Sequence, residues 1–179
     1  MKLKAGLEVH QQLDCGKLFC TCGKLESGEN RSFKRVLHPT SSEMGAMDAA
    51  AKAEGIREFT YYNKSCNCLV YTDEEPPRGP NNHAVEIAVQ FAKLVGAKVI
   101  EEVQFMRKIV VDGSNTSGFQ RTGLIAVGGQ IEYEGGKLEL EQICLEEDSC
   151  RHGEHKDEYI LDRLGIPCLL YTSPSPRDS

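Results

Sequence analysis

The feature that most constrains the fold is a series of short segments with alternating polarity in the second half of the chain. Residues 124–127 form an apolar run typical of a buried strand. Residues 131–133 and 138–140 each alternate apolar and polar side chains, and a glycine pair at 135–136 stands between them. This pattern predicts a β-hairpin, because two glycines allow the tight turn between antiparallel strands. The hairpin leads into a further predicted strand at residues 143–148, which ends in an acidic run.

One long helix is predicted at residues 81–95. Its apolar side chains recur every three or four residues, and Gly96 follows where such a helix would end. A T-x-x-E spacing at residues 40–43, ahead of an alanine-rich run at 48–53, predicts a second, short helix. We expect the apolar stripe of the long helix to face the core; its members are Ala84, Ile87, Ala88, Phe91, Leu94 and Val95.

The composition is that of an ordinary globular chain. Its 179 residues are 40% hydrophobic and 27% charged, which excludes a disordered polypeptide. The net charge of −6 argues against general electrostatic adhesion to nucleic acid or membranes, although a local basic patch could still hold RNA. No stretch approaches the roughly 18 apolar residues of a membrane span, and no signal-peptide pattern opens the chain. Eight cysteines without a secretion signal therefore indicate a reducing cytoplasm, with thiols that are free or metal-bound.

Residues 3–10 alternate as a strand does, and they place Glu8 and His10 on the same face. At the rise of a β-strand these two side chains lie about 6–7 Å apart. An imidazole beside a carboxylate forms half of a metal site or of an acid–base pair. The alternative is the solvated face of an edge strand.

Residues 106–122 combine a short apolar run with a loop of small polar residues that has cations at both ends. Guanidinium groups and backbone N–H donors pair with anionic oxygens, so this segment predicts contact with a phosphate or carboxylate. The spacing from Gly113 to Gly118 imitates a phosphate-binding loop, but Phe119 stands where the lysine would be, and that motif fails. An ordinary turn is the alternative. The candidate contact residues are Arg107, Lys108, Ser114, Asn115, Thr116 and Arg121.

Two cysteine pairs suit a structural zinc ion. Four thiolates can bind Zn²⁺ tetrahedrally, and the pairs Cys20/Cys22 and Cys66/Cys68 supply four. Each pair has one intervening residue where the usual zinc knuckle has two, so unligated cysteines are the alternative. The other four, Cys15, Cys144, Cys150 and Cys168, follow no ligand pattern and are expected to be structural.

The composition changes from Cys168 onward. The string CLLYTSPSPRDS has no periodic pattern, repeats Ser-Pro, and looks like translated sequencing-adapter read-through. We therefore expect residues 1–167 to form the folded part and residues 168–179 to be a flexible tail outside it. The chain contains no internal repeat and no Ser-His-Asp or Cys-His pattern with a defensible spacing.

Six segments carry specific motifs in a fixed order. They are GLEVHQQLD at 6–14, LFCTC at 18–22, CLVYTDEEPP at 68–77, MRKIVVDGSNTSGFQRT at 106–122, LEEDSCR at 145–151 and LDRLGIP at 161–167. In this order they resemble the B/E-subunit family of tRNA-dependent amidotransferases, with its archaeal-type E-subunit branch as the nearer match. The resemblance runs over nearly all of residues 2–167.

The resemblance implies an α+β fold, the first part of the family's cradle domain, with a mixed or antiparallel sheet and flanking helices. It also implies ATP-dependent amidation of glutamate charged on tRNA(Gln). The γ-phosphate of ATP would pass to the glutamyl carboxylate, and ammonia from an amidase or asparaginase-like partner would displace it. Domains that bind tRNA would follow the present chain, so we expect the chain to be inactive by itself.

The family's Mg²⁺ site, carried over by motif, falls on Glu8, His10 and Glu147. A fourth ligand, a glutamate shortly after the GIP motif, has no counterpart, because the chain reads Cys168, Leu169, Leu170 there. Mg²⁺ accepts two or three carboxylates together with retained waters, so the remaining residues could suffice. Two alternatives stay open: a zinc-stabilised RNA-binding module, and a structural module whose partner performs all the chemistry.

Overall fold

The computed structural model describes residues 5–22, 31–37, 52–53, 55–63, 68–70, 72, 74–108, 120–148, 151–161 and 166–173. Within these residues no helix has both the length and the apolar run needed to cross a membrane. The elements are β1 (Glu8–Gln12), β2 (Arg31–Leu37), β3 (Arg57–Asn63), α2 (Asn82–Leu94), β4 (Lys98–Val99), β5 (Phe105–Lys108), β6 (Gln120–Val127), β7 (Gln130–Tyr133), β8 (Gly136–Glu139), β9 (Gln142–Asp148), β10 (Arg151–His152), β11 (Glu158–Leu161) and β12 (Ile166–Thr172).

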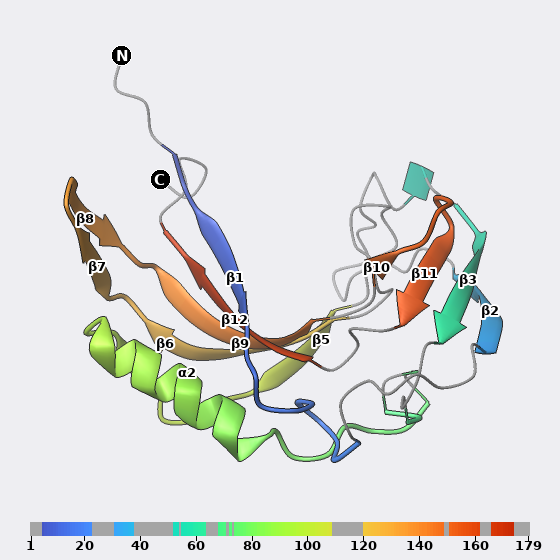
Figure 1. Cartoon of the computed structure of the whole chain (residues 1–179), viewed down its shortest axis with the longest axis horizontal. Coiled ribbons are helices and arrows are strands. Elements are labelled where there is room, and N and C mark those ends of the chain that lie inside the picture. The colour runs from blue at the N-terminus through green and yellow to red at the C-terminus, as the bar shows by residue number, and fades with distance from the viewer. Residues whose placement is uncertain are drawn as a thin grey trace.

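Six antiparallel strands form a large sheet. Its order is β1-β12-β9-β6-β4, and β5 also pairs with β6. Helix α2 lies along one face of this sheet (Figure 1) and contacts β9, β6 and β4. We call the face turned away from α2 the open face, because no described helix covers it in Figure 1. The core lies between α2 and the sheet; its fully buried members there are Ala84, Ala88, Ala92, Ile125, Ile143 and Leu145.

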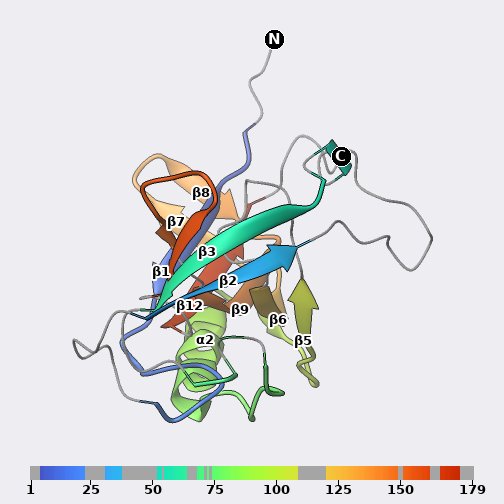
Figure 2. The same cartoon turned by 90° about the vertical axis from the view of Figure 1, so that its right-hand side faces the viewer.

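A small sheet stands beyond one end of the large sheet (Figure 1), and β2 and β3 cross in front of the large sheet in Figure 2. Its order is β10-β11-β3-β2; β11 and β3 are parallel and the other pairs antiparallel. Aromatic side chains hold it together: Phe33 stacks on Tyr61 at 5.2 Å, and Tyr159 lies 5.4 Å from Tyr61 and 5.5 Å from Phe59, all between ring centroids. The expected α+β fold with antiparallel and mixed sheets is confirmed.

The long helix is confirmed, with one error in its buried stripe. Asn81 caps the first turn, because its side-chain oxygen accepts hydrogen bonds from two backbone N–H groups, and Gly96 ends the helix with φ at 69°. The predicted stripe member Leu94 is 85% exposed, whereas Ala92 is fully buried. The buried line of Ala84, Ala88 and Ala92 has a spacing of four, and small side chains let the helix approach the sheet closely. The predicted short helix falls almost entirely outside the described residues.

The predicted hairpin is confirmed as β7 and β8, which pair from Gln130–Glu139 to Tyr133–Gly136. It forms a two-stranded sheet of its own. The apolar run before it is part of β6, and the acidic run after it ends β9, as the polarity pattern predicts.

The expectation of a flexible tail from Cys168 onward is wrong for residues 168–172. These residues belong to β12, which pairs with β1 on one side and β9 on the other. Cys168, Leu169 and Leu170 are 3%, 4% and 8% exposed, so this apolar run is buried in the middle of the sheet. A strand with two neighbours satisfies its backbone hydrogen bonds on both edges and needs no sequence alternation. Residues 174–179 lie outside the described part of the chain.

Strand β9 directs its two glutamates to opposite faces of the sheet. Successive strand residues alternate sides, so Glu147 points with Ile143 and Leu145 toward α2, and Glu146 points with Cys144 to the open face. On the helix side, Glu147 pairs with Arg121 of β6, whose Nη1 lies 3.1 Å from Oε1. Both side chains are at least 96% buried.

The Arg121 guanidinium has further partners in the same place. Its Nη2 donates to the Val70 carbonyl at 3.2 Å, and its central carbon lies 5.6 Å from the centre of the Phe19 ring. A buried ion pair of this kind is costly to break, because removal of one partner leaves the other charge without compensation. The pair therefore ties β6, β9 and two loops together beneath the open face.

We predict that Glu147→Gln lowers the free energy of unfolding by about 3 kcal/mol, because Arg121 would keep a buried charge without its counter-ion. Urea denaturation measures this. The matched control is Glu146→Gln, which should change stability by less than about 1 kcal/mol, since a neutral amide still accepts a hydrogen bond and needs less desolvation. Equal losses in the two variants would contradict the assignment of the two glutamates to different faces.

Candidate functional site

The open face holds a cluster of one imidazole and two carboxylates. Strand β1 supplies Glu8 and His10, and β9 supplies Glu146. The two ring nitrogens of His10 face different carboxylates: Nε2 lies 3.0 Å from Oε1 of Glu8, and Nδ1 lies 3.0 Å from Oε1 of Glu146. The predicted neighbourhood of Glu8 and His10 on one strand face is thus confirmed.

The three residues meet across an intervening strand. Strands β1 and β9 each pair with β12, so His10 and Glu146 lie two strand spacings, about 9.6 Å, apart across the sheet and are also offset by two residues along it. Only long side chains can bridge this distance. The register places Leu170 of β12 opposite His10, and Cys168 opposite Glu146. These two side chains therefore form the surface over which the imidazole and the carboxylate meet.

The predicted convergence of Glu8, His10 and Glu147 is wrong in its third member. Glu147 points to the helix side and binds Arg121, and Glu146 joins the cluster in its place. The two glutamates are adjacent in sequence and identical in chemistry, so only the side of the sheet on which each lies distinguishes them. The alternation of β9 distinguishes them. Ile143 and Leu145 are apolar and share a side with Glu147, which indicates that this side faces the core.

The electrostatics around the Glu146 carboxylate favour a nearby positive charge. Burial raises the pKa of the Glu146 carboxyl above its usual range, and the Glu8 carboxylate raises it further, while His10 and a hydrogen bond from Thr122 act in the opposite direction. The side chain of Glu146 is 4% exposed, whereas those of His10 and Glu8 are 48% and 62% exposed. A buried carboxylate with a second carboxylate nearby is stabilised by a positive charge.

The donor atoms fit Mg²⁺ in part. His10, Glu146 and Cys168 have potential ligand atoms within 4.8 Å of one another, and Glu8 contacts the same imidazole. Mg²⁺ prefers oxygen ligands and keeps several waters, but the imidazole lies between the two carboxylates, and Glu8 is not among the residues whose ligand atoms lie within 4.8 Å of one another. The Cys168 thiol is too soft a ligand for Mg²⁺. Leu170, opposite His10, cannot bind a metal at all.

An open polar cavity of about 340 Å³ adjoins Glu8. Its lining residues lie at the start of β1, the start of β9 and the end of β12. Its lining residues are Gly6, Leu7, Glu8, Glu141, Gln142, Thr172 and Ser173. A ligand held there would reach the Glu8 carboxylate directly.

The structure describes the side chain of only one of the predicted anion-contact residues, Arg121. Arg121, predicted to contact a phosphate or carboxylate of a ligand, is 3% exposed and is paired instead with the carboxylate of Glu147 on the helix side. Arg107 and Lys108 belong to β5, and their side chains lie outside the described part of the structure. The loop residues Ser114, Asn115 and Thr116 also lie outside the described residues. Their role in anion binding stays a prediction.

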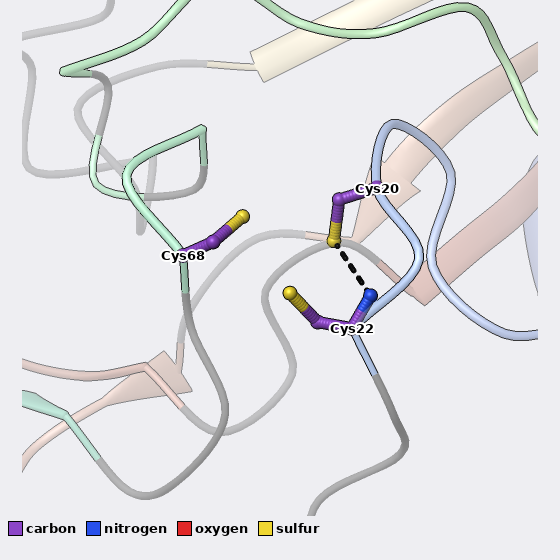
Figure 3. A group of neighbouring side chains, drawn as sticks. All are labelled: Cys20, Cys22 and Cys68. Atoms are coloured by element: carbon purple, nitrogen blue, oxygen red, sulfur yellow. Dashed lines mark hydrogen bonds between the residues drawn. The ribbon is translucent and has the colours of Figure 1, made fainter.

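Three of the four predicted zinc ligands come together. The sulfur atoms of Cys20, Cys22 and Cys68 lie within 4.8 Å of one another and point toward a common centre from two separate loops (Figure 3). The Cys22 backbone N–H donates to Sγ of Cys20 at 3.4 Å. Burial raises the pKa of Cys20 to about 12, so this thiol is protonated unless a cation compensates its charge. Cys66 lies outside the described residues.

Sequence reasoning missed Glu146, a member of the open-face cluster, and Thr122, which contacts it. The Thr122 hydroxyl donates to Oε2 of Glu146 at 3.2 Å, from the position directly opposite it on β6. Nothing in the sequence marks this threonine, since its partner is 24 residues away and the pairing depends on strand register.

Comparison with known proteins agrees with this architecture. The family model described as the GatB/GatE catalytic domain matches residues 3–178. The E subunit of glutamyl-tRNA(Gln) amidotransferase from Thermoplasma volcanium is 48% identical over 97% of this chain, and that from Pyrococcus furiosus is 50% identical over 97%. The corresponding protein of Archaeoglobus fulgidus is 49% identical over 93% of the chain. The chain spans about 30% of the length of these relatives.

The family match covers almost the whole chain, including both strands that supply the open-face cluster and the strand between them. The chain belongs to the GatB/GatE catalytic domain family.

Proposed function

We propose that this chain is the catalytic part of an enzyme that converts glutamate charged on tRNA(Gln) to glutamine. The observation that carries the proposal is the cluster of Glu8, His10 and Glu146 on the open face. It occurs in a chain that is 48–50% identical to proteins named as the E subunit of glutamyl-tRNA(Gln) amidotransferase. The reaction would consume ATP and pass through a γ-glutamyl phosphate.

In this proposal Glu8, His10 and Glu146 hold Mg²⁺. The ion, when bound, would neutralise charge on the phosphates during phosphoryl transfer, a reaction in which catalysis is mostly positioning and electrostatic stabilisation. Glu146 supplies a buried, fixed carboxylate, and His10 contacts both carboxylates and so holds them at a set spacing. The more exposed Glu8 borders the 340 Å³ cavity and can meet a phosphate that enters from there.

The open face suits a large substrate. The side chains of Glu8 and His10 are 62% and 48% exposed, so a glutamyl group carried by tRNA could reach this part of the cluster from solvent. Ammonia would come from an amidase or asparaginase-like partner, and tRNA would be held by other parts of the full-length protein. The names of the relatives support a multi-subunit enzyme of protein synthesis, and we place it in the cytoplasm.

A second candidate function has one observation in its favour. The convergence of Cys20, Cys22 and Cys68 supports a zinc-stabilised module, which could bind RNA or a partner without chemistry of its own. The two proposals differ in the open-face cluster, because only the enzyme requires Glu8 and Glu146 to bind a divalent ion.

We predict that Glu146→Gln weakens Mn²⁺ binding by about tenfold or more, with Mn²⁺ used as a paramagnetic substitute for Mg²⁺. Loss of the free-Mn²⁺ electron paramagnetic resonance signal during a protein titration measures the affinity, and competition by Mg²⁺ tests the choice of ion. Glu147→Gln, examined at a temperature where it is folded, is the control and should keep the affinity within about twofold. A wild-type chain that does not bind either ion would contradict the proposed enzyme site.

We predict about one zinc ion per chain in protein purified without chelators, bound by Cys20, Cys22, Cys68 and the fourth predicted ligand Cys66. Elemental analysis by plasma mass spectrometry gives the stoichiometry. Cys68→Ser should lose most of this zinc, because the three remaining thiols leave the tetrahedral site incomplete. Cys144→Ser, which removes a buried thiol of the open face, should keep it. Zinc-free wild-type protein would contradict the prediction.

A further inference from the structure

The thiols of Cys20, Cys22 and Cys68 form one cysteine site from two separate loops. Their sulfur atoms lie within 4.8 Å of one another (Figure 3), although a long segment of the chain separates Cys22 from Cys68. A metal ion bound to thiols of both loops joins the loops and closes the segment between them, which opposes their separation.

The same two loops also hold the buried guanidinium of Arg121. Phe19 directly precedes Cys20, and its ring centre lies 5.6 Å from the central carbon of the Arg121 guanidinium. Val70 follows Cys68 by two residues, and its carbonyl oxygen accepts a hydrogen bond of 3.2 Å from Nη2 of Arg121. Each loop of the cysteine site thus supplies one contact to this side chain.

These contacts are buried. Phe19 packs edge-to-face on Phe105 of β5 at 5.1 Å between ring centroids, and its backbone carbonyl accepts a hydrogen bond of 3.3 Å from the Arg78 N–H. Phe19 and Val70 are 2% and 1% exposed, and Arg121 is 3% exposed. A displacement of either loop would therefore remove contacts from a charge that has little access to water.

We propose that metal binding at the cysteine site and the Arg121–Glu147 ion pair stabilise each other. A soft divalent ion that joins the two loops holds Phe19 and Val70 against the guanidinium, and the guanidinium in turn keeps the loops at the spacing that the ion requires. Such a coupling free energy is reciprocal. The inference rests on the zinc site proposed above in one respect, that an ion binds these thiols.

The coupling extends to the large sheet. Arg121 belongs to β6 and Glu147 to β9, and these two strands are paired within the sheet. An ion bound in the loops therefore stabilises the alignment of two strands that supply none of its proposed ligands. Because the ion binds only to the folded loops, its binding energy adds to the stability of the fold.

The test measures zinc affinity, by competition with a chelator of known affinity, in the wild type and in Glu147→Gln at a temperature where both are folded. We expect Glu147→Gln to weaken zinc binding by about tenfold, although Glu147 is not one of the proposed ligands. The reason is that an unpaired Arg121 leaves its place and releases the two loops. Wild-type zinc affinity in Glu147→Gln would overturn the inference.

Ile143→Ala is the matched control. It removes a fully buried apolar side chain from the same strand, about 13 Å from Glu147, and leaves both charges of the ion pair in place. This variant lowers stability without loss of the coupling, so it should keep the zinc affinity within about twofold. Equal losses in the two variants would contradict the coupling, since they would reflect general destabilisation.

Alkylation of the thiols separates this inference from the zinc site itself. If the wild type does not bind zinc, the zinc site fails, and the link between the loops and the ion pair is tested with iodoacetamide and peptide mass spectrometry. We expect Glu147→Gln, but not Ile143→Ala, to raise the alkylation rates of Cys20 and Cys68 by about fivefold or more. Cys144, which is 6% exposed in β9, reports general opening of the sheet. Rates that rise no more at Cys20 and Cys68 than at Cys144 would overturn the link as well.

Discussion

The buried ion pair between Arg121 and Glu147 is the interaction on which the open-face cluster depends. Desolvation of both charges is costly, so the pair is stable only with the close geometry and additional partners seen here, the Val70 carbonyl and the Phe19 ring. It fixes which side of β9 faces the helix. Since neighbouring strand residues alternate sides, an inward Glu147 requires an outward Glu146, and the proposed metal-binding carboxylate is placed by its neighbour's structural role.

The cluster is assembled from two strands that are not neighbours, so the side chains of the strand between them form the surface beneath it. β12 separates β1 from β9, and its side chains Cys168 and Leu170 lie beneath the imidazole and the carboxylate. These two residues contribute no hard ligand, so the oxygen donors come from β1 and β9 alone. The thiols of Cys20, Cys22 and Cys68 gather from two separate loops, and three soft donors suit a different ion from the one that the carboxylates of Glu8 and Glu146 would bind.

Much of the local structure could be predicted from short-range patterns. The helix of residues 82–94, the hairpin of β7 and β8, and the common face of Glu8 and His10 all follow from periodicities of 3.6 or 2 residues within one segment. The pairing of cysteines also anticipated the meeting of three thiols. The motif order in the sequence indicated the family before any geometry was known, and the match over residues 3–178 bears that out.

What only the tertiary structure decided is how these segments align across the sheet. Periodicity shows that Glu146 and Glu147 lie on opposite faces, but which face holds the helix depends on the pairing of β9 with β6 and β12. For the same reason Arg121 could be mistaken for a ligand-binding cation, Leu94 for a core residue and residues 168–172 for a tail. Composition and spacing are properties of one segment, whereas burial and register are properties of the pairing between segments, and these depend on the energy of the whole sheet.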